Sequence, residues 1–175
     1  MSDSHIEFAQ TSSGQLSLAT LQAERAIYRT FCNYLFFVDR DKQYERACIE
    51  CFKSDAKITY HMASGSALIF HGRNEFLDYL ESHARPTTQM SAHVLGQSRI
   101  HWINGKPRIS AYITAWHWLS ANEEAGDLRP ADWTTIGFAE DDFENVEGNW
   151  LISRRSVKPA AGLVAAGSAP PELPL

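Results

Sequence analysis

The stretch "VDRDKQYERACIECFKSDAKITY", residues 38–60, decides the fold because its pattern of apolar residues changes twice. It begins at the end of a first helix over about residues 17–38, whose inward stripe is Ile27, Phe31, Leu35 and Val38. An amphipathic pattern over about residues 42–52 predicts a second helix. The segment "AKITYHMA", residues 56–63, then alternates as a strand does.

The rest of the chain extends this order with one more helix and several strands. We expect a strand at "ALIFHG" and a third helix at "RNEFLDYLESHA". A first hairpin should join "SAHVLGQSRIHWI" to "RISAYITAWHWLSA" through an Asn-Gly turn. A second hairpin should join "DWTTIGFAEDDFE" to "WLISRRSVKP". Helices first and antiparallel strands afterwards predict an α+β domain. A curved sheet wrapped around the helices would enclose a cavity.

Length and composition indicate one soluble domain. The 175 residues fit one domain with a full core, over residues 17–159. Residues 1–16 are polar and are expected to be mobile, and the Ala/Gly/Pro-rich tail 160–175 is expected to lack regular structure. A net charge of -5 argues against a broad nucleic-acid surface, and no apolar run approaches the roughly 20 residues of a membrane span.

The cysteines and the N-terminus favour a cytoplasmic protein. The N-terminal residues lack a basic region followed by an apolar run, so we predict no signal peptide. Three cysteines are an odd number, which favours reduced thiols. Cys48 and Cys51 form a C-x-x-C pattern, but they share the apolar stripe of the second helix. We therefore interpret them as small core residues, with a metal or redox pair as the alternative.

Asp39 places a negative charge where a helix normally disfavours one. It lies four residues beyond Leu35, so it continues the buried stripe of the first helix at the helix C-terminus. The helix dipole disfavours a negative charge there by a few tenths of a kcal/mol to about 1 kcal/mol. One explanation is a histidine partner in a pocket. The alternative is a cap or a surface pair with Arg40 or Arg73.

Other polar residues fall on apolar faces. Tyr60 alternates with Ile58 and Met62, which predicts that it faces inward. His117 alternates with small residues and either touches substrate or is a core histidine. Tyr34, five residues before Asp39, either reaches the cavity or is a core aromatic residue.

No signature of a metal or nucleotide site is recognisable in the sequence. His61 and His71 fall on neighbouring predicted strands, but no carboxylate or third histidine completes a ligand set. "ASGSA" lacks the Lys and helix of a P-loop, and no G-x-S-x-G occurs. We assign no metal and no cofactor.

The order of elements and four motifs resemble the SnoaL-like branch of the NTF2-like superfamily, and within it the scytalone dehydratase group. The motifs are residues 38–60, "FHGRNEFLDYL", "SAHVLG" and "EGNWLISRRSVKP". The resemblance spans about residues 18–159. It implies a cone-shaped α+β barrel in which three helices pack into a curved mixed sheet.

The resemblance also implies roles for individual residues. Asp39 and His93 match an orienting carboxylate and a histidine base, and Tyr60 matches a tyrosine that polarises a substrate carbonyl. His117 matches a second histidine, which could protonate a departing hydroxyl. Val38 replaces a family tyrosine and, with Tyr34, Ile58 and Met62, is expected to bind substrate. The family's asparagine on the penultimate strand has no match in "TIGFAED".

The residues and the resemblance together predict a cofactor-independent lyase. The expected reaction is dehydration of a small cyclic or polyketide-derived hydroxy-ketone. An isomerase or aldol-type cyclase would begin with the same proton abstraction, and a non-catalytic binding protein is the competing class. The outer sheet face, with Trp116 and Trp118, is either core or an oligomer contact, and we expect it to mediate a homodimer or homotrimer.

Overall fold

The fold comes from a computed structural model that describes residues 17–39, 41–125 and 129–160. Its elements are, in chain order, α1 (Leu18–Val38), α2 (Tyr44–Cys51), β1 (Phe52–His61), β2 (Ala67–His71), α3 (Arg73–Tyr79), the π-helix η1 (Leu80–Ala84), α4 (Arg85–Thr87), β3 (Thr88–Ile103), β4 (Lys106–Leu119), the 3-10 helix η2 (Ser120–Ala125), β5 (Trp133–Val146) and β6 (Asn149–Pro159). The expected mobile segment 1–16 and the tail from residue 161 lie outside the described residues.

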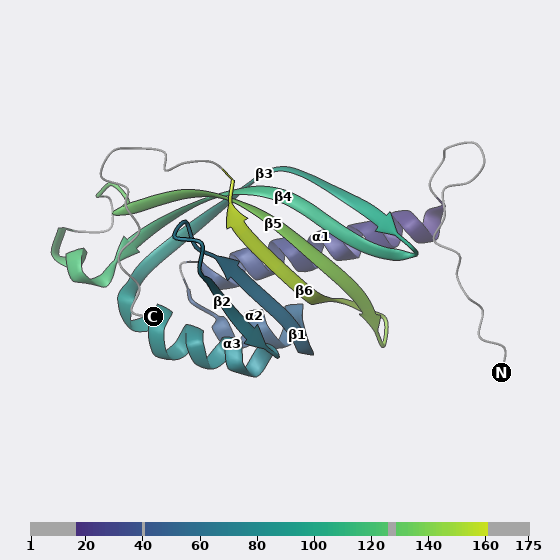
Figure 1. Cartoon of the computed structure of the whole chain (residues 1–175), viewed down its shortest axis with the longest axis horizontal. Coiled ribbons are helices and arrows are strands. Elements are labelled where there is room, and N and C mark those ends of the chain that lie inside the picture. The colour runs from purple at the N-terminus through teal and green to yellow at the C-terminus, as the bar shows by residue number, and fades with distance from the viewer. Residues whose placement is uncertain (1–16, 40, 126–128, 161–175) are drawn as a thin grey trace.

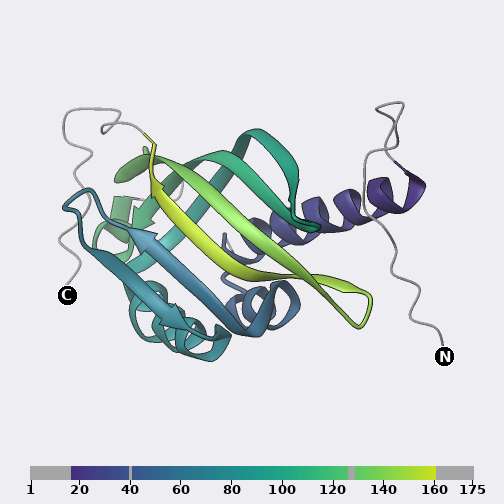
Figure 2. The same ribbon diagram turned by 45° about the vertical axis from the view of Figure 1, so that its right-hand side comes forward.

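The strands form one sheet with the order β2-β1-β6-β5-β4-β3. Strands β1 and β6 are parallel, and every other neighbouring pair is antiparallel. The sheet curves strongly without closing, and the helices lie on its concave side (Figures 1 and 2). The predicted α+β fold with a mixed, curved sheet is therefore confirmed.

Helix α1 forms the centre of the concave layer. Its N-cap is Ser17, whose hydroxyl accepts a hydrogen bond from the backbone N of Thr20 at 3.0 Å. Ile27 and Phe31 on its inner stripe have no exposed surface. The helix crosses beneath the long strands (Figure 1) and ends at Val38. Its C-cap Asp39 contacts His93 of β3, the edge strand of the sheet.

Some predicted boundaries were wrong. The second helix ends at Cys51 and β1 begins at the next residue, Phe52, four residues earlier than alternation suggested. The predicted third helix is divided into α3, the π-helix η1 and the short α4. Its inward side is as expected, because Phe76 and Leu80 are buried.

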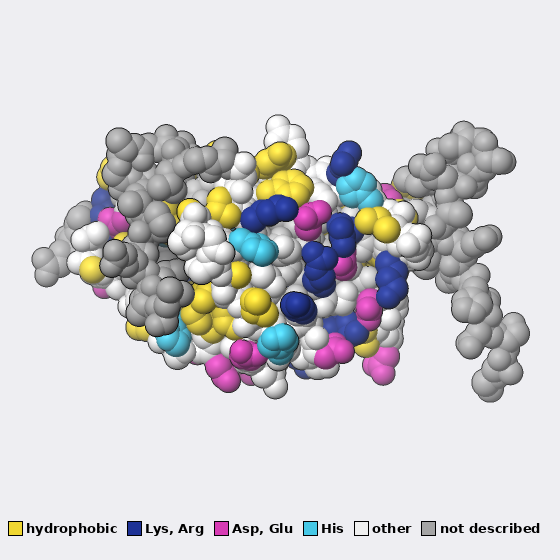
Figure 3. Space-filling model, in the orientation of Figure 1, with side chains coloured by type: hydrophobic (Ala, Val, Ile, Leu, Met, Phe, Trp, Pro, Cys, Tyr) yellow, Lys and Arg dark blue, Asp and Glu magenta, His cyan; other side chains and the backbone are white. Residues whose placement is uncertain are grey.

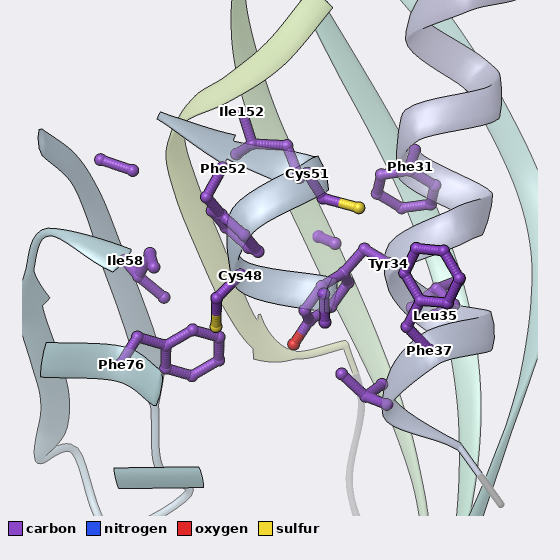
Figure 4. Packing of buried hydrophobic residues seen from close by; sticks show 14 of the residues in the cluster. Phe31, Tyr34, Leu35, Phe37, Cys48, Cys51, Phe52, Ile58, Phe76 and Ile152 are labelled. Carbon is purple, nitrogen blue, oxygen red and sulfur yellow. The ribbon is translucent and has the colours of Figure 1, made fainter. Parts of the chain in front are cut away.

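The helices and the sheet enclose an aromatic core (Figure 4). Cys48 and Cys51 belong to it, with 1% exposure each, among Phe31, Phe52 and Phe76. Burial raises the pKa of each of the two thiols to about 12. Both are free thiols, as is the half-buried Cys32, so the interpretation of the C-x-x-C pair as core residues is confirmed.

The convex face of the sheet mixes charged and apolar side chains (Figure 3). Val94 and Tyr112 are half exposed on it, and Tyr112 packs against Phe138 with a centroid distance of 5.1 Å. Assembly through this face stays a prediction. None of the helices in the described ranges is both long and apolar enough to cross a membrane.

Candidate active site

A cavity of about 550 Å³ lies between the concave face of the sheet and the helices. Six of the predicted site residues line it: Tyr34, Val38, Tyr60, Met62, His93 and His117. Ile58 is different, because its side chain is fully buried in the core and is not part of the cavity wall. Alternation alone placed Ile58 on the correct face of β1 but did not distinguish the packed part of that face from the hollow part.

Asp39 is paired with His93, which lines the cavity, whereas Asp39 itself is not among the lining residues. The Oδ1 atom of Asp39 lies 2.5 Å from the ring Nδ1 of His93, and its Oδ2 atom accepts from the backbone N of His93 at 3.0 Å. The hydroxyl of Ser91 shares its one proton between the carbonyl of Val38 at 3.2 Å and this carboxylate at 3.3 Å. Donors from one strand thus stabilise the charge that the helix dipole disfavours.

The position of β3 explains why these donors are available. It is an edge strand, so the backbone N–H groups on its outer side have no neighbouring strand. The carboxylate of Asp39 satisfies one of them. The alternative surface pair with Arg73 is wrong, because that guanidinium donates to the carbonyls of Ile49 and Phe52. Arg40 lies outside the described residues.

The pairing fixes which nitrogen of His93 can act as a base. An ionised carboxylate only accepts hydrogen bonds, so the proton of a neutral His93 lies on Nδ1. The lone pair is then on Nε2. The side chain of His93 is 18% exposed and that of Asp39 is 21% exposed, so the pair is sheltered, and His93 is its member that lines the cavity. This arrangement suits a general base whose imidazolium form is stabilised by a neighbouring charge.

His117 lies next to this pair on β4. Its ring makes an edge contact with the ring of His93 at a centroid distance of 6.0 Å and stacks on Trp133 at 4.4 Å. Burial, and secondarily the neighbouring His93, lowers the pKa of His117 to about 4. The ring is therefore neutral at neutral pH. A neutral imidazole donates or accepts a hydrogen bond well but is a poor proton donor to a leaving hydroxide, which argues against the predicted role as acid.

Two tyrosines, Tyr34 and Tyr60, form another polar part of the wall. The hydroxyls of Tyr34 and Tyr60 are 2.8 Å apart. Tyr34 is 4% exposed, and burial, followed by the neighbouring Tyr60, raises its pKa well above the ordinary value. Tyr34 is thus both a buried aromatic residue and part of the cavity wall, so the two alternatives for it coincide.

Arg155 and Asp141 form a buried ion pair behind the tyrosines. The Nη1 atom of Arg155 donates to Oδ2 of Asp141 at 2.7 Å, and their side chains are 2% and 0% exposed. The guanidinium carbon lies 4.2 Å from the centroid of the Tyr34 ring, and Arg155 lines the cavity. No sequence pattern singled out this arginine as a candidate site residue. The signal was its place in β6, two residues before Val157, which also lines the cavity.

The two histidines considered as metal ligands are apart. In the pairing of β1 with β2, His61 lies opposite Ala67 and His71 lies opposite Lys57. Four residues of strand therefore separate them. Within the described ranges, no group of three or more His, Cys, Asp or Glu side chains could hold a metal ion.

The sequence comparison decides the family. The profile of the SnoaL-like domain matches residues 19–156. The chain belongs to the SnoaL-like domain family. A comparison of this SnoaL-like protein with curated proteins finds no match.

Solved structures share the fold of this SnoaL-like protein at low sequence identity. A protein from Novosphingobium aromaticivorans, provisionally assigned as a scytalone dehydratase, is 19% identical over 87% of this chain and 95% of its own, with a TM-score of 0.67. The hexachlorocyclohexane dehydrochlorinase LinA-type3 from Novosphingobium barchaimii is 18% identical, covers 88% and 99%, and has a TM-score of 0.67. ActVI-ORFA from Streptomyces coelicolor is 12% identical, covers 79% and 98%, and has a TM-score of 0.61.

Proposed function

We propose that this SnoaL-like protein is a cofactor-independent lyase that dehydrates a small cyclic or polyketide-derived hydroxy-ketone. The observation that supports the proposal is the pair of His93 and Asp39, because Asp39 engages Nδ1 of His93 and His93 lines a largely apolar cavity. The cavity volume of about 550 Å³ suits a ligand of one to a few rings. The names of the neighbours favour elimination chemistry, since one is called a dehydratase and another a dehydrochlorinase.

In the proposed reaction, Nε2 of His93 removes a proton from the carbon next to the substrate carbonyl. Asp39 stabilises the imidazolium that forms, and the hydroxyl of Tyr60 donates a hydrogen bond to the developing enolate oxygen. The enolate electrons then expel the hydroxyl group from the β-carbon. A proton from the imidazolium of His93 neutralises this group, so water leaves and the base is regenerated.

His117 has a different part in this scheme from the one that the family resemblance implied. Because its pKa is about 4, it stays neutral and orients the leaving hydroxyl by a hydrogen bond, without supplying a proton. Trp133 holds its ring by stacking. The acid step therefore belongs to His93, which holds the abstracted proton.

The same first step also suits an isomerase or an aldol-type cyclase. All three reactions begin by removing a proton α to a carbonyl, and they differ in what the enolate does next. A binding protein without turnover is the remaining alternative, because folds of this kind serve many functions.

Proton NMR of a panel of cyclic β-hydroxy-ketones tests the proposal. We expect loss of water and appearance of the conjugated enone, faster than in buffer and abolished in a His93→Ala variant. An isomerase would shift a double bond without releasing water, and a cyclase would join two carbons of an open chain. Saturable binding with no product from any member of the panel would contradict the proposed enzyme.

A further inference from the structure

The buried ion pair behind the tyrosines needs a functional explanation. Removing two charges from water is costly, and apolar residues of similar volume often stabilise a protein as well. Here the pair is also imperfectly satisfied, since Oδ1 of Asp141 and Nε of Arg155 are buried without a hydrogen-bond partner. The guanidinium is not a remote structural group, because Arg155 lines the cavity together with Tyr34 and Tyr60.

The guanidinium of Arg155 lies next to the tyrosine pair. It donates to the carboxylate of Asp141 at 2.7 Å, and both side chains are buried. The face of the Tyr34 ring lies against the same guanidinium at 4.2 Å.

The direction of the bond between the two tyrosines follows from burial. Tyr34 is almost completely buried and its oxygen lies 2.8 Å from that of Tyr60. A buried hydroxyl needs an acceptor for its proton, and Tyr60 is the acceptor at hand. Tyr60 then accepts from Tyr34, and the proton of Tyr60 is free to point into the cavity.

We propose that Arg155 and Tyr34 are positioning residues that act on the ligand through Tyr60, and that together they make this end of the cavity a subsite for a phenolate or enolate oxygen. Arg155 packs against the ring of Tyr34, and the hydrogen bond from Tyr34 polarises the O–H bond of Tyr60, as in other hydrogen-bonded chains in a low-dielectric interior. The inference rests on the proposed function in one respect, namely that Tyr60 is the donor to the substrate oxygen. Asp141 keeps the guanidinium in place from behind.

4-Nitrophenol is a suitable probe because its anion absorbs visible light and needs no turnover. We expect the cavity to hold the anion, so the bound probe should ionise at a lower pH than the free probe. Tyr60→Phe should shift this midpoint back toward the free value, and Tyr34→Phe should do so in part. The matched control is Tyr44→Phe, another cavity-lining tyrosine, which packs against Arg85 and should leave the midpoint unchanged.

A double-mutant cycle tests whether the effect passes through Tyr60. Tyr34→Phe should have no further effect in the Tyr60→Phe background. The double exchange Arg155→Met with Asp141→Leu removes both buried charges together, and the variant should still unfold cooperatively. It should raise the pH at which bound 4-nitrophenol ionises. It should also lower kcat more than it raises KM. An equal effect of Tyr34→Phe with and without Tyr60 would overturn the inference, as would an unchanged midpoint in the charge-free exchange.

The outcomes separate the two proposals. A midpoint that depends on Tyr34 and Tyr60, with no turnover of any hydroxy-ketone, would contradict only the proposed enzyme. Turnover that depends on His93 but is indifferent to Tyr34 would contradict only the inference about positioning. If the variant without the two buried charges does not fold, the double-mutant cycle between Tyr34 and Tyr60 still tests the inference about positioning.

Discussion

Asp39 contacts His93 at two points, with one carboxylate oxygen on the ring Nδ1 at 2.5 Å and the other on the backbone N at 3.0 Å. The two contacts link β3 to the end of α1 and fix the orientation of the imidazole. Asp39 therefore contacts both the backbone of the edge strand and the proposed catalytic base. A change at Asp39 should show itself in the rate more than in the fold, because Ser91 and the sheet edge stay in place.

Replacing Asp39 with asparagine should remove most of the activity. Loss of a general base lowers a rate by about 10²–10⁴-fold, and an amide no longer stabilises the imidazolium. Rates of Asp39→Asn, His93→Ala and the double variant should be measured with the same substrate. We expect the double variant to be little worse than His93→Ala, because the residues act as one unit. If the loss of rate in the double variant equals the product of the two single losses, the two residues act independently. His71→Ala, an exposed histidine outside the cavity wall, is the control.

Acid should destabilise the protein partly through His117. Its pKa falls from 6.5 to about 4 in the folded chain, mainly through burial. The unfolded chain therefore binds more protons between these values, so the contribution is complete above pH 6.5 and is lost as the pH falls to 4. Its size is about 3 kcal/mol at most.

Urea unfolding at neutral pH and at about pH 4.5 measures this contribution. The free energy of unfolding should fall less with acid in His117→Gln than in the wild type. His71→Gln is the matched control and should behave as the wild type does. An identical acid dependence in His117→Gln would show that this histidine is not held neutral.

Cys48 and Cys51 should be inert toward thiol reagents in the folded protein. Burial raises the pKa of each thiol to about 12, so little thiolate forms at pH 8. Reaction with Ellman's reagent should show at most one accessible thiol, and Cys32→Ser should remove it. Urea should expose the other two. Fast reaction of folded Cys32→Ser would contradict the core assignment.

Activity should not depend on a divalent metal. The proposed steps use only His93, Asp39, Tyr60 and a substrate carbonyl. Prolonged treatment with EDTA, followed by gel filtration, should leave kcat/KM unchanged. A loss that added Zn²⁺ restores would contradict this mechanism.

The sequence was sufficient to predict the pair of Asp39 and His93. A helical stripe that ends in Asp39 puts a charge on an apolar face, and such a charge needs a partner. The family motif then supplied His93, and the structure brings the two side chains together. Periodicity was also sufficient for Tyr60 and His117, because strand alternation sets the face on which a side chain lies.

The rest depended on three-dimensional detail that alternation does not carry. Ile58 and Tyr60 share a face of β1, yet only Tyr60 reaches the cavity, because helix packing fills the space over Ile58. Arg155 stood among the charged residues of "SRRSVKP", where alternation does not tell a buried arginine from an exposed one. Its partner Asp141 lies on the neighbouring strand β5, and only the register of β5 with β6 pairs them.

Exchange of α-protons tests the central claim, that His93 is the base, without knowledge of the true substrate. A cyclic ketone such as 2-tetralone should be incubated in D₂O with the wild type, His93→Ala and His71→Ala, and its α-proton signals followed by NMR. We predict exchange above the buffer rate with the wild type and His71→Ala, and a fall of about 10² or more with His93→Ala. Exchange by His93→Ala at the wild-type rate would contradict the account.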